Sequence, residues 1–188
     1  ANLILLQKMT ETPLEEAKKY INPEKEVNTA EDALNGAKDI LAESVSDNAD
    51  FRTHIRELTM KHGQLLSAAK DPEAESVYEM YYEFSESLSK LAGHRILAIS
   101  RGEKEKFLTV KIDAPVDRIL SYLDRKLITA PSAPTAAVLH EVTEDAYNRL
   151  IAPAIEREIR SNLFEKAEDG AIRVFGKNLE QLLMQPPI

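Results

Sequence analysis

The 188-residue sequence contains no cysteine and no tryptophan. Without cysteine, the chain cannot form disulfide bonds, thiolate zinc sites, iron–sulfur clusters or a cysteine nucleophile. No apolar run approaches the ~18 residues that a membrane-spanning helix needs, and no segment resembles a cleavable leader peptide. Hydrophobic residues make up 43% of a chain that is long enough to bury a core without crosslinks. We therefore expect a soluble, globular, cytoplasmic protein with no membrane contact.

Sequence patterns of catalysis are also missing. The six glycines form neither a P-loop nor a dinucleotide fingerprint, and no serine lies in a nucleophile elbow. His140 and Glu144 lie one helical turn apart, which is half of a metal-binding face, but the sequence suggests no third ligand. A solvated helix surface is the favoured interpretation of this pair. We predict no active site, metal, cofactor or small-molecule substrate, and thus a protein that is not an enzyme.

An aromatic run could suggest a platform on which nucleic-acid bases stack. Its members are Tyr78, Tyr81, Tyr82 and Phe84, and they alternate with Glu75, Glu79, Glu83 and Glu86. Because these carboxylates would repel phosphates, we expect the rings to pack in the core with their polar tips at the surface.

Charge is distributed unevenly along the chain. The formal net charge is −8, and the first fifty residues carry five lysines against eleven acidic residues. The span 95–111 has the opposite sign, because two glutamates accompany its five basic residues, Arg95, Arg101, Lys104, Lys106 and Lys111. A solvated surface patch is the common interpretation of such a cluster, and a weak phosphate-contacting edge is the functional one.

Helix signals recur along the chain. Thr12-Pro13 and Thr29 are predicted helix starts, and a further helix should follow Ser46 or Asp47 and end at Gly63. Asp71-Pro72 and Ala114-Pro115 are predicted to start two more helices. His94 to Arg101 is ambiguous between helix and strand, and we favour a helix that Gly102 stops as a left-handed cap.

Two segments indicate strands. Glu105 to Ile112 is rich in β-branched and aromatic residues, and Gln64 to Lys70 is short and follows a glycine. Because a lone strand cannot satisfy its backbone groups, we expect 65–70 to pair with 106–112.

The clearest linker is TAPSAP, Thr129 to Pro134. Beyond it the pattern stays helical nearly to Met184, with a kink or restart at Pro153, and Gln185-Pro186-Pro187-Ile188 forbids further helix. A straight helix over 134–184 would extend roughly 75 Å, whereas a globule of this size is about 40 Å across. We therefore predict a helical domain over 1–131 and a long helical segment over 132–188, with both ends resembling cuts through a longer protein.

Several stretches resemble the bacterial transcription accessory protein Tex family, in its N-terminal helical region. They are GHRILAISRGEKEKFL (Gly93–Leu108), INPEKEV (Ile21–Val27), AEDALNGAKDILAE (Ala30–Glu43), DAYNRLIAPAIEREIR (Asp145–Arg160) and NLEQLLMQPPI (Asn178–Ile188). The resemblance covers essentially the whole chain in family order.

The resemblance implies a mainly α, multihelical fold with a helix-turn-helix-like part, beside the two-stranded β element and the long C-terminal helices. It also implies that the chain ends just before an RNase-H-like (YqgF-like) domain, with an S1 RNA-binding domain later in the protein. The family is associated with transcription and nucleic-acid binding rather than with a known reaction. Two hypotheses follow: a non-catalytic scaffold that contacts nucleic acid weakly or through the rest of the protein, and a module that docks on the transcription or translation machinery.

Overall fold

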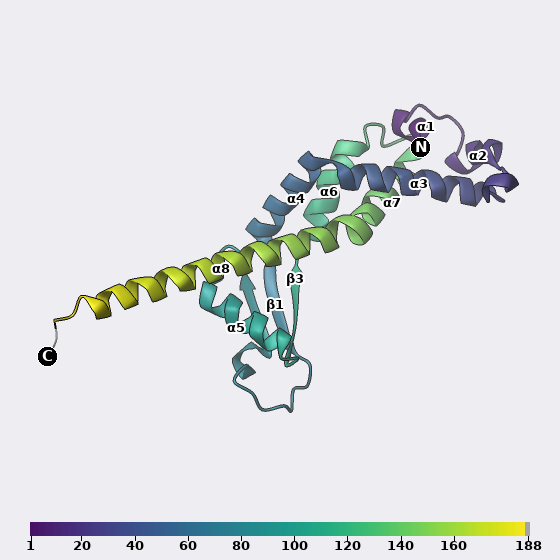
Figure 1. The fold of residues 1–188 in the computed structure, drawn as a ribbon. Coiled ribbons are helices and arrows are strands. Elements are labelled where there is room, and N and C mark those ends of the chain that lie inside the picture. The colour runs from purple at the N-terminus through teal and green to yellow at the C-terminus, as the bar shows by residue number, and fades with distance from the viewer. Residues whose placement is uncertain (187–188) are drawn as a thin grey trace. The chain divides into compact units, whose positions relative to one another are not determined.

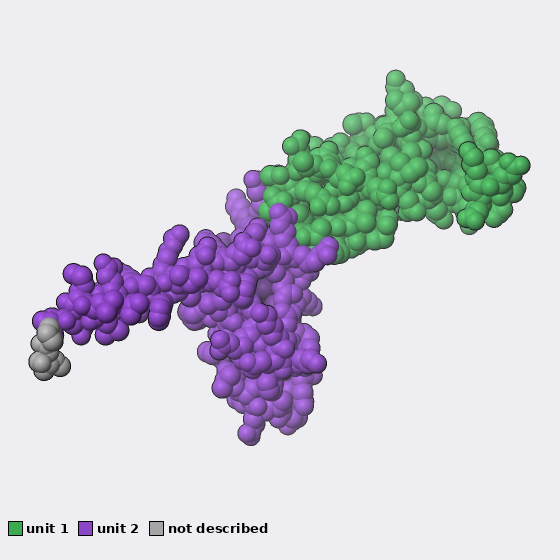
Figure 2. Space-filling model, in the orientation of Figure 1, with its two compact units in different colours: residues 1–56, 116–155 green, residues 57–115, 156–188 purple. Residues whose placement is uncertain are grey.

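The computed structural model describes residues 1–186 and confirms the prediction of a mainly α-helical protein. The chain forms two compact units, each built from two separate stretches of sequence (Figure 2). Unit 1 comprises residues 1–56 and 116–155, and unit 2 comprises residues 57–115 and the chain from Glu156 onward. The division of the protein into domains 1–131 and 132–188 stays a prediction.

Unit 1 is a bundle of helices. Its elements are α1 (Asn2–Leu6), α2 (Pro13–Ala17), the 3-10 turns Lys18–Tyr20 and Pro23–Lys25, α3 (Ala30–Asp47), the start of α4 (Ala49–His62), α6 (Val116–Leu127), α7 (Thr135–Asp145), the π-helical turn Ala146–Ile151 and the start of α8 (Ala152–Leu183). Helix α3 packs against α2, α7 and the π-helical turn. Large apolar side chains that are fully buried form the core, namely Ile55, Ile119, Leu123, Leu139 and Ile151.

Most of the helix starts expected in unit 1 are confirmed. Thr29 Oγ1 accepts a hydrogen bond from the Asp32 N–H at 3.1 Å, and the Asp32 carboxylate accepts one from the Thr29 N–H at 2.9 Å, which is a capping box. Helix α4 ends immediately before Gly63 as expected, but it starts after Asn48 and not after Ser46 or Asp47, which are the last residues of α3, and α6 follows Pro115. These signals lie within a few residues of each helix end, which explains why the sequence alone identifies them.

The expected linker Thr129–Pro134 is non-helical and is held by one distant side chain. Gln7 Nε2 donates to the Leu127 carbonyl at 2.7 Å, and Gln7 Oε1 accepts from the N–H groups of Thr129 and Ala130 at 2.8 and 3.0 Å. The Gln7 amide thus forms hydrogen bonds with three backbone groups where α6 ends. The Leu127 carbonyl is one of the groups at a helix end that have no partner within the helix.

Unit 2 is built around a three-stranded antiparallel sheet of order β2-β1-β3, formed by β1 (Gln64–Ala69), β2 (Glu83–Ser87) and β3 (Leu108–Asp113) (Figure 1). The expected pairing of 65–70 with 106–112 is confirmed, with Leu65 opposite Ile112 and Ser67 opposite Val110. The expectation of only two strands is wrong, because β2 pairs with the other edge of β1. Strand β2 reads EFSES and has one apolar residue, so its periodicity is a weak signal.

Two helices cover one face of this sheet. Helix α5 (Gly93–Lys104) packs against β3, and α8 joins it over the same face. Ile96, Ile99 and Leu163 of these helices line a small cavity of about 20 Å³ together with Leu65 and Val110 of the strands. Leu108 and Ile99 are almost fully buried, so this helix–sheet contact is the core of unit 2.

The helix expected after Asp71-Pro72 is absent from the described residues. Residues 70–82 form a loop whose regular part is the 3-10 turn Glu79–Tyr81. Tyr78 and Tyr81 are each only 5% exposed, which confirms the expected core packing for these two rings, whereas Tyr82 and Phe84 are half-buried. Residues three apart share one side of both a 3-10 turn and an α-helix, so the spacing of these rings does not distinguish the two.

The expected role of Gly102 as a left-handed cap is also wrong. Helix α5 continues through Gly102 to Lys104, and the left-handed residue is Lys106, with φ of 68°. A Cβ atom at Gly102 would lie 2.6 Å from Leu108 Cδ1. Residue 102 is therefore a glycine because α5 packs closely against β3, and not because the chain changes direction there.

The long C-terminal helix is confirmed. Helix α7, the π-helical turn and α8 follow one another from Thr135 to Leu183, and the π-helical turn precedes Pro153, whose missing N–H interrupts the α-helical ladder. Every residue from Glu168 to Pro186 is exposed. Pro187 and Ile188, at the expected helix stop, lie outside the described residues.

We expect Gly63→Ala to destabilise unit 2 by about 1–3 kcal/mol, because the new Cβ would lie 2.4 Å from the Thr59 carbonyl oxygen, a backbone atom that cannot rotate away. Gly170→Ala is the matched control, since nothing lies within 4 Å of its Cβ and alanine should stabilise the α8 interior by about 1 kcal/mol. Urea denaturation followed by circular dichroism measures both changes. Equal stability of the two variants would contradict the expected clash.

Candidate nucleic-acid interface

The five basic residues singled out in the sequence all belong to unit 2. Arg95 lies near the start of α5, Arg101 and Lys104 lie in its last turn, Lys106 lies in the turn that follows, and Lys111 lies on β3. The cationic side chains at the end of α5 interact favourably with its carbonyl-terminated end. The α5–β3 connection therefore concentrates positive charge at one end of this helix.

The Arg95 side chain makes contacts within unit 2. Its Nη1 donates to Glu86 Oε2 at 2.7 Å, and its guanidinium lies 5.8 Å from the centre of the Phe84 ring. Both partners belong to β2, so Arg95 links α5 to this edge strand. Its side chain is 41% exposed, and a bound phosphate would compete with Glu86 for the guanidinium.

Lys111 lies on the other face of the sheet. Along β3, Leu108 is buried and Val110 faces the helices, whereas Thr109, Lys111 and Asp113 are exposed. Because side chains alternate along a strand, Lys111 points away from α5 and its cations. The structure therefore does not bring the five residues together on a single surface.

Arg101, Lys104 and Lys106 are exposed and lie close along the chain. Lys104 Nζ lies 5.4 Å from the centre of the Phe164 ring on α8. Arg101 is near Tyr78, where burial and a hydrogen bond with Glu105 raise the pKa of the tyrosine and the arginine charge opposes that rise. Of the predicted residues, these three form the most compact and accessible group.

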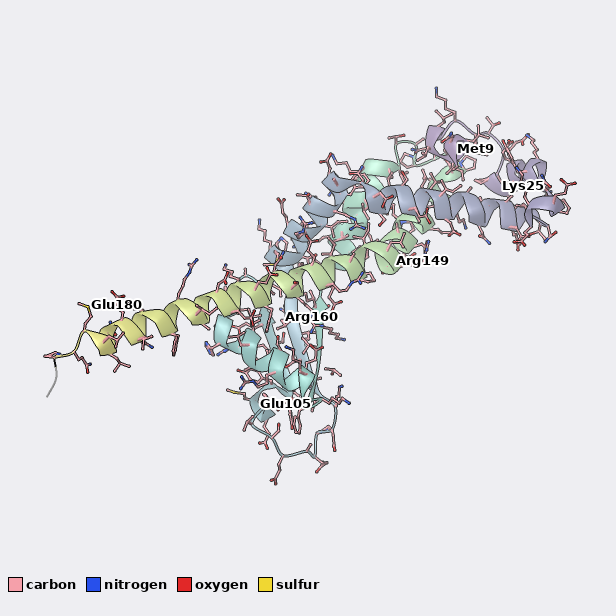
Figure 3. All side chains as sticks on the ribbon, viewed as in Figure 1. Met9, Lys25, Glu105, Arg149, Arg160 and Glu180 are labelled. Atoms are coloured by element: carbon pink, nitrogen blue, oxygen red, sulfur yellow. The ribbon has the colours of Figure 1, made fainter. Side chains whose placement is uncertain are left out.

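Two further cations adjoin this group from distant parts of the sequence. Arg160 of α8 forms an ion pair with Glu103 of α5, and Figure 3 shows Arg160 on α8 and Glu105 at the end of α5. Lys70, at the end of β1, donates its backbone N–H to the Phe107 carbonyl at 2.9 Å, which places it beside Lys106. Neither residue has a local sequence signal, because sheet pairing and helix packing bring both to the site.

The other candidate residues have structural roles. In unit 1, His140 Nδ1 lies 2.7 Å from Asp124 Oδ2, and the buried Thr143 hydroxyl donates to Asp124 Oδ1 at 2.6 Å, so this cluster links α6 to α7. Among residues 1–186, no group of three or more histidine and acidic side chains is arranged to hold a metal ion. The helices within the same range include none long and apolar enough to cross a bilayer.

Comparison with known proteins places the chain among relatives of much greater length. Residues 8–175 match a family described as Tex central region-like. The chain is 50% identical over 175 residues to the uncharacterized protein YdcI of Bacillus subtilis, covering 92% of this chain and 24% of that protein. It is 35% identical over 187 residues to the protein tex of Bordetella pertussis, with coverages of 91% and 24%.

A more distant relative is the transcription elongation factor SPT6 homolog of Arabidopsis thaliana, which is 26% identical over 188 residues, covering 93% of this chain and 11% of that protein. The chain thus spans about a quarter of the length of its bacterial relatives.

We expect Arg95 and Glu86 to be coupled by about 0.5–1 kcal/mol in a double-mutant cycle of Arg95→Ala and Glu86→Ala, because the pair is close and partly shielded. The exposed pair Arg149 and Asp145, at 2.8 Å and four residues apart, is the matched comparison, for which about 0.3–0.5 kcal/mol is expected. Chemical denaturation of the single and double variants measures both energies. No coupling for Arg95 and Glu86 would contradict the structural role of Arg95.

Proposed function

We propose that this chain, which belongs to the Tex family of transcription accessory proteins, is a non-catalytic helical scaffold of such a protein. In this role it supports nucleic-acid binding and transcription regulation by the longer polypeptide in the cytoplasm. Its own contact with RNA or DNA is weak and auxiliary. The proposal includes the helix-turn-helix-like part that the family resemblance implies.

One observation carries the scaffold proposal: α8 bears a broad apolar arc that no described residue of unit 2 covers. Ile172, Val174 and Phe175 are 61–68% exposed, and Leu179, Leu182 and Leu183 are 45–78% exposed. At 100° per residue, Phe175, Leu179, Ile172 and Leu183 lie on one side of the helix. A helix in a protein gains most of its stability when its apolar face packs against another element. The arc therefore supports a role in holding another part of the protein.

A groove beside this arc adds to the same surface. It has a volume of about 790 Å³ and is lined by residues of α5, of the segment before α5 and of α8, including Leu97, Leu163, Ala171 and Phe175. All of its lining residues belong to unit 2. A surface of this kind accepts a packed helix or loop.

The auxiliary nucleic-acid contact is proposed for Arg101, Lys104 and Lys106, with Lys111 and Arg95 as the remaining members of the predicted set. Lysine and arginine provide phosphate affinity, but the chain as a whole carries a net charge of −8. A strong non-specific complex would require many more phosphate contacts than this group supplies.

The alternative is a protein-interaction module that docks on the transcription or translation machinery. The same apolar arc favours it, together with the acidic first fifty residues, which would suit a basic partner. The two proposals differ in what covers the arc.

We expect amide hydrogen exchange at residues 172–183 to be at least about tenfold slower in the full-length polypeptide than in this chain alone, because the scaffold proposal requires the arc to be packed there. Exchange in α3 provides the internal reference. Protection that arises only when RNA polymerase or ribosomes are added would favour the docking module, and unchanged exchange under all of these conditions would contradict both proposals.

We expect Arg101→Ala and Lys104→Ala each to weaken binding of a short RNA or DNA by a similar factor for every sequence, and to reduce the slope of log affinity against log salt by about 1. Lys8→Ala and Lys25→Ala, which remove exposed cations of unit 1, are the matched controls. Filter binding over a salt series measures the slopes. Unchanged affinity of the Arg101→Ala/Lys104→Ala double variant would eliminate this contact, and tight, salt-insensitive binding would contradict its auxiliary character.

A further inference from the structure

The loop between β1 and β2 is far longer than the turn that joins two adjacent antiparallel strands. Residues 70–82 separate these strands, whereas hairpin loops usually have two to five residues. Figure 1 shows the loop projecting beyond the sheet at the end of α5. Long ordered loops in compact domains are frequently functional, so the construction of this loop is informative.

Hydrogen bonds and buried rings hold the loop in one conformation. The Tyr82 hydroxyl donates to the Ala74 carbonyl at 2.5 Å and lies 2.8 Å from Ser76 Oγ. The buried Ser67 hydroxyl donates to the Tyr81 carbonyl. The Tyr78 ring lies 5.8 Å from the Phe107 ring, centre to centre. The fold therefore anchors this segment through its tyrosines.

In this conformation of the loop, two apolar side chains point toward solvent. Val77 is 85% exposed and Met80 is 72% exposed, whereas their neighbours Tyr78 and Tyr81 are buried. Two pairs of residues three apart therefore face opposite ways, with Tyr78 and Tyr81 inward and Val77 and Met80 toward solvent. We call Val77 and Met80 the apolar tip. A methionine here is well suited to recognition, because its flexible, polarizable side chain adapts to a partner's surface.

Acidic residues flank the apolar tip. Asp71, Glu73, Glu75, Glu79 and Glu83 are exposed, and Lys70 is the single basic residue of 70–83. Within the described part of the chain, none of these five carboxylates takes part in an ion pair. Arg101, on α5, is the cation whose charge reaches Tyr78 beneath the loop, and Glu105 beside it is hydrogen-bonded to that tyrosine. The outer surface of the loop is thus negatively charged around an apolar centre.

The acidic residues and the apolar tip together indicate which class of partner can bind this loop. Five exposed carboxylates outside ion pairs repel the phosphates of nucleic acids and the anionic surface of membranes. They attract lysine and arginine, and the apolar tip at their centre fits a partner that also offers an apolar contact. We propose that the acid-flanked apolar tip is a docking site for a basic polypeptide segment that carries a large apolar side chain between its cations. The site adjoins the Arg101–Lys106 group at the end of α5 but is built from other residues, and it does not depend on the role proposed for that group or for the α8 arc.

The test uses the peptide Lys-Lys-Leu-Phe-Lys-Lys, blocked at both ends, as the probe. In heteronuclear NMR spectra of the chain, we expect saturable shifts concentrated on residues 75–80, including the methyl groups of Val77 and Met80. Lys-Lys-Ala-Ala-Lys-Lys should bind at least about fivefold more weakly, because it lacks the apolar contact. Glu-Glu-Leu-Phe-Glu-Glu should not shift these resonances, because its charge matches that of the loop.

Variants of the chain separate the two parts of the site. Val77→Ser/Met80→Ser should weaken peptide binding at least about tenfold, and Glu73→Gln/Glu75→Gln should weaken it severalfold at low salt and flatten its salt dependence. The matched controls are Ile40→Ser, which removes a 61% exposed apolar side chain in unit 1, and Glu24→Gln/Glu57→Gln, which removes two exposed carboxylates elsewhere. Both controls should bind as the unaltered chain does, and unchanged circular dichroism confirms that each variant is folded.

Several results would overturn the proposal. These are an absence of shifts at residues 75–80, equal binding of the Leu-Phe and Ala-Ala peptides, or shifts centred on α8. Shifts at the apolar tip caused by a short RNA or DNA duplex would show that the acidic residues do not exclude phosphates. Shifts that grow with protein concentration alone would identify a second copy of this chain as the occupant.

Discussion

The packing of α5 and α8 against one face of a three-stranded sheet is the interaction on which unit 2 depends. Leu65, Leu108 and Ile99 meet in this contact, and the strands have no other buried apolar face. The helices bury the one apolar face of this three-stranded sheet, and a small sheet needs such a face or a helix packed on it for stability. The same contact fixes the direction of every side chain on β3, and it requires a glycine at position 102 so that α5 can lie close to Leu108.

Much of the helical framework could be predicted, because the signals that define it are local. The Thr29–Asp32 capping box, the end of α4 at Gly63 and the start of α6 after Pro115 each depend on residues that are neighbours in sequence. Strand β2 and the loop before it could not be predicted in the same way. The aromatic spacing at 78 and 81 fits a helix and a 3-10 turn equally, so this spacing does not show which of the two the chain forms.

The candidate interface shows a similar division. A sequence count can find that 95–111 is basic, but it cannot reveal that strand alternation turns Lys111 to the opposite face or that Glu86 occupies Arg95. It also cannot find Arg160 and Lys70, which reach the same region through helix packing and strand pairing. Charge along the chain is therefore a guide to where cations occur, whereas the tertiary structure decides which of them one ligand can touch.

Position 7 illustrates how strictly a single contact can select its amino acid. The Gln7 side chain acts as donor to one carbonyl and as acceptor for two N–H groups in the segment after α6. Glutamate would supply the acceptor without the donor, lysine the donor without the acceptor, and asparagine would be one methylene too short. Glutamine is the side-chain amide that presents a donor and an acceptor together at this reach, so natural variation at this site should be far narrower than its partly open environment suggests.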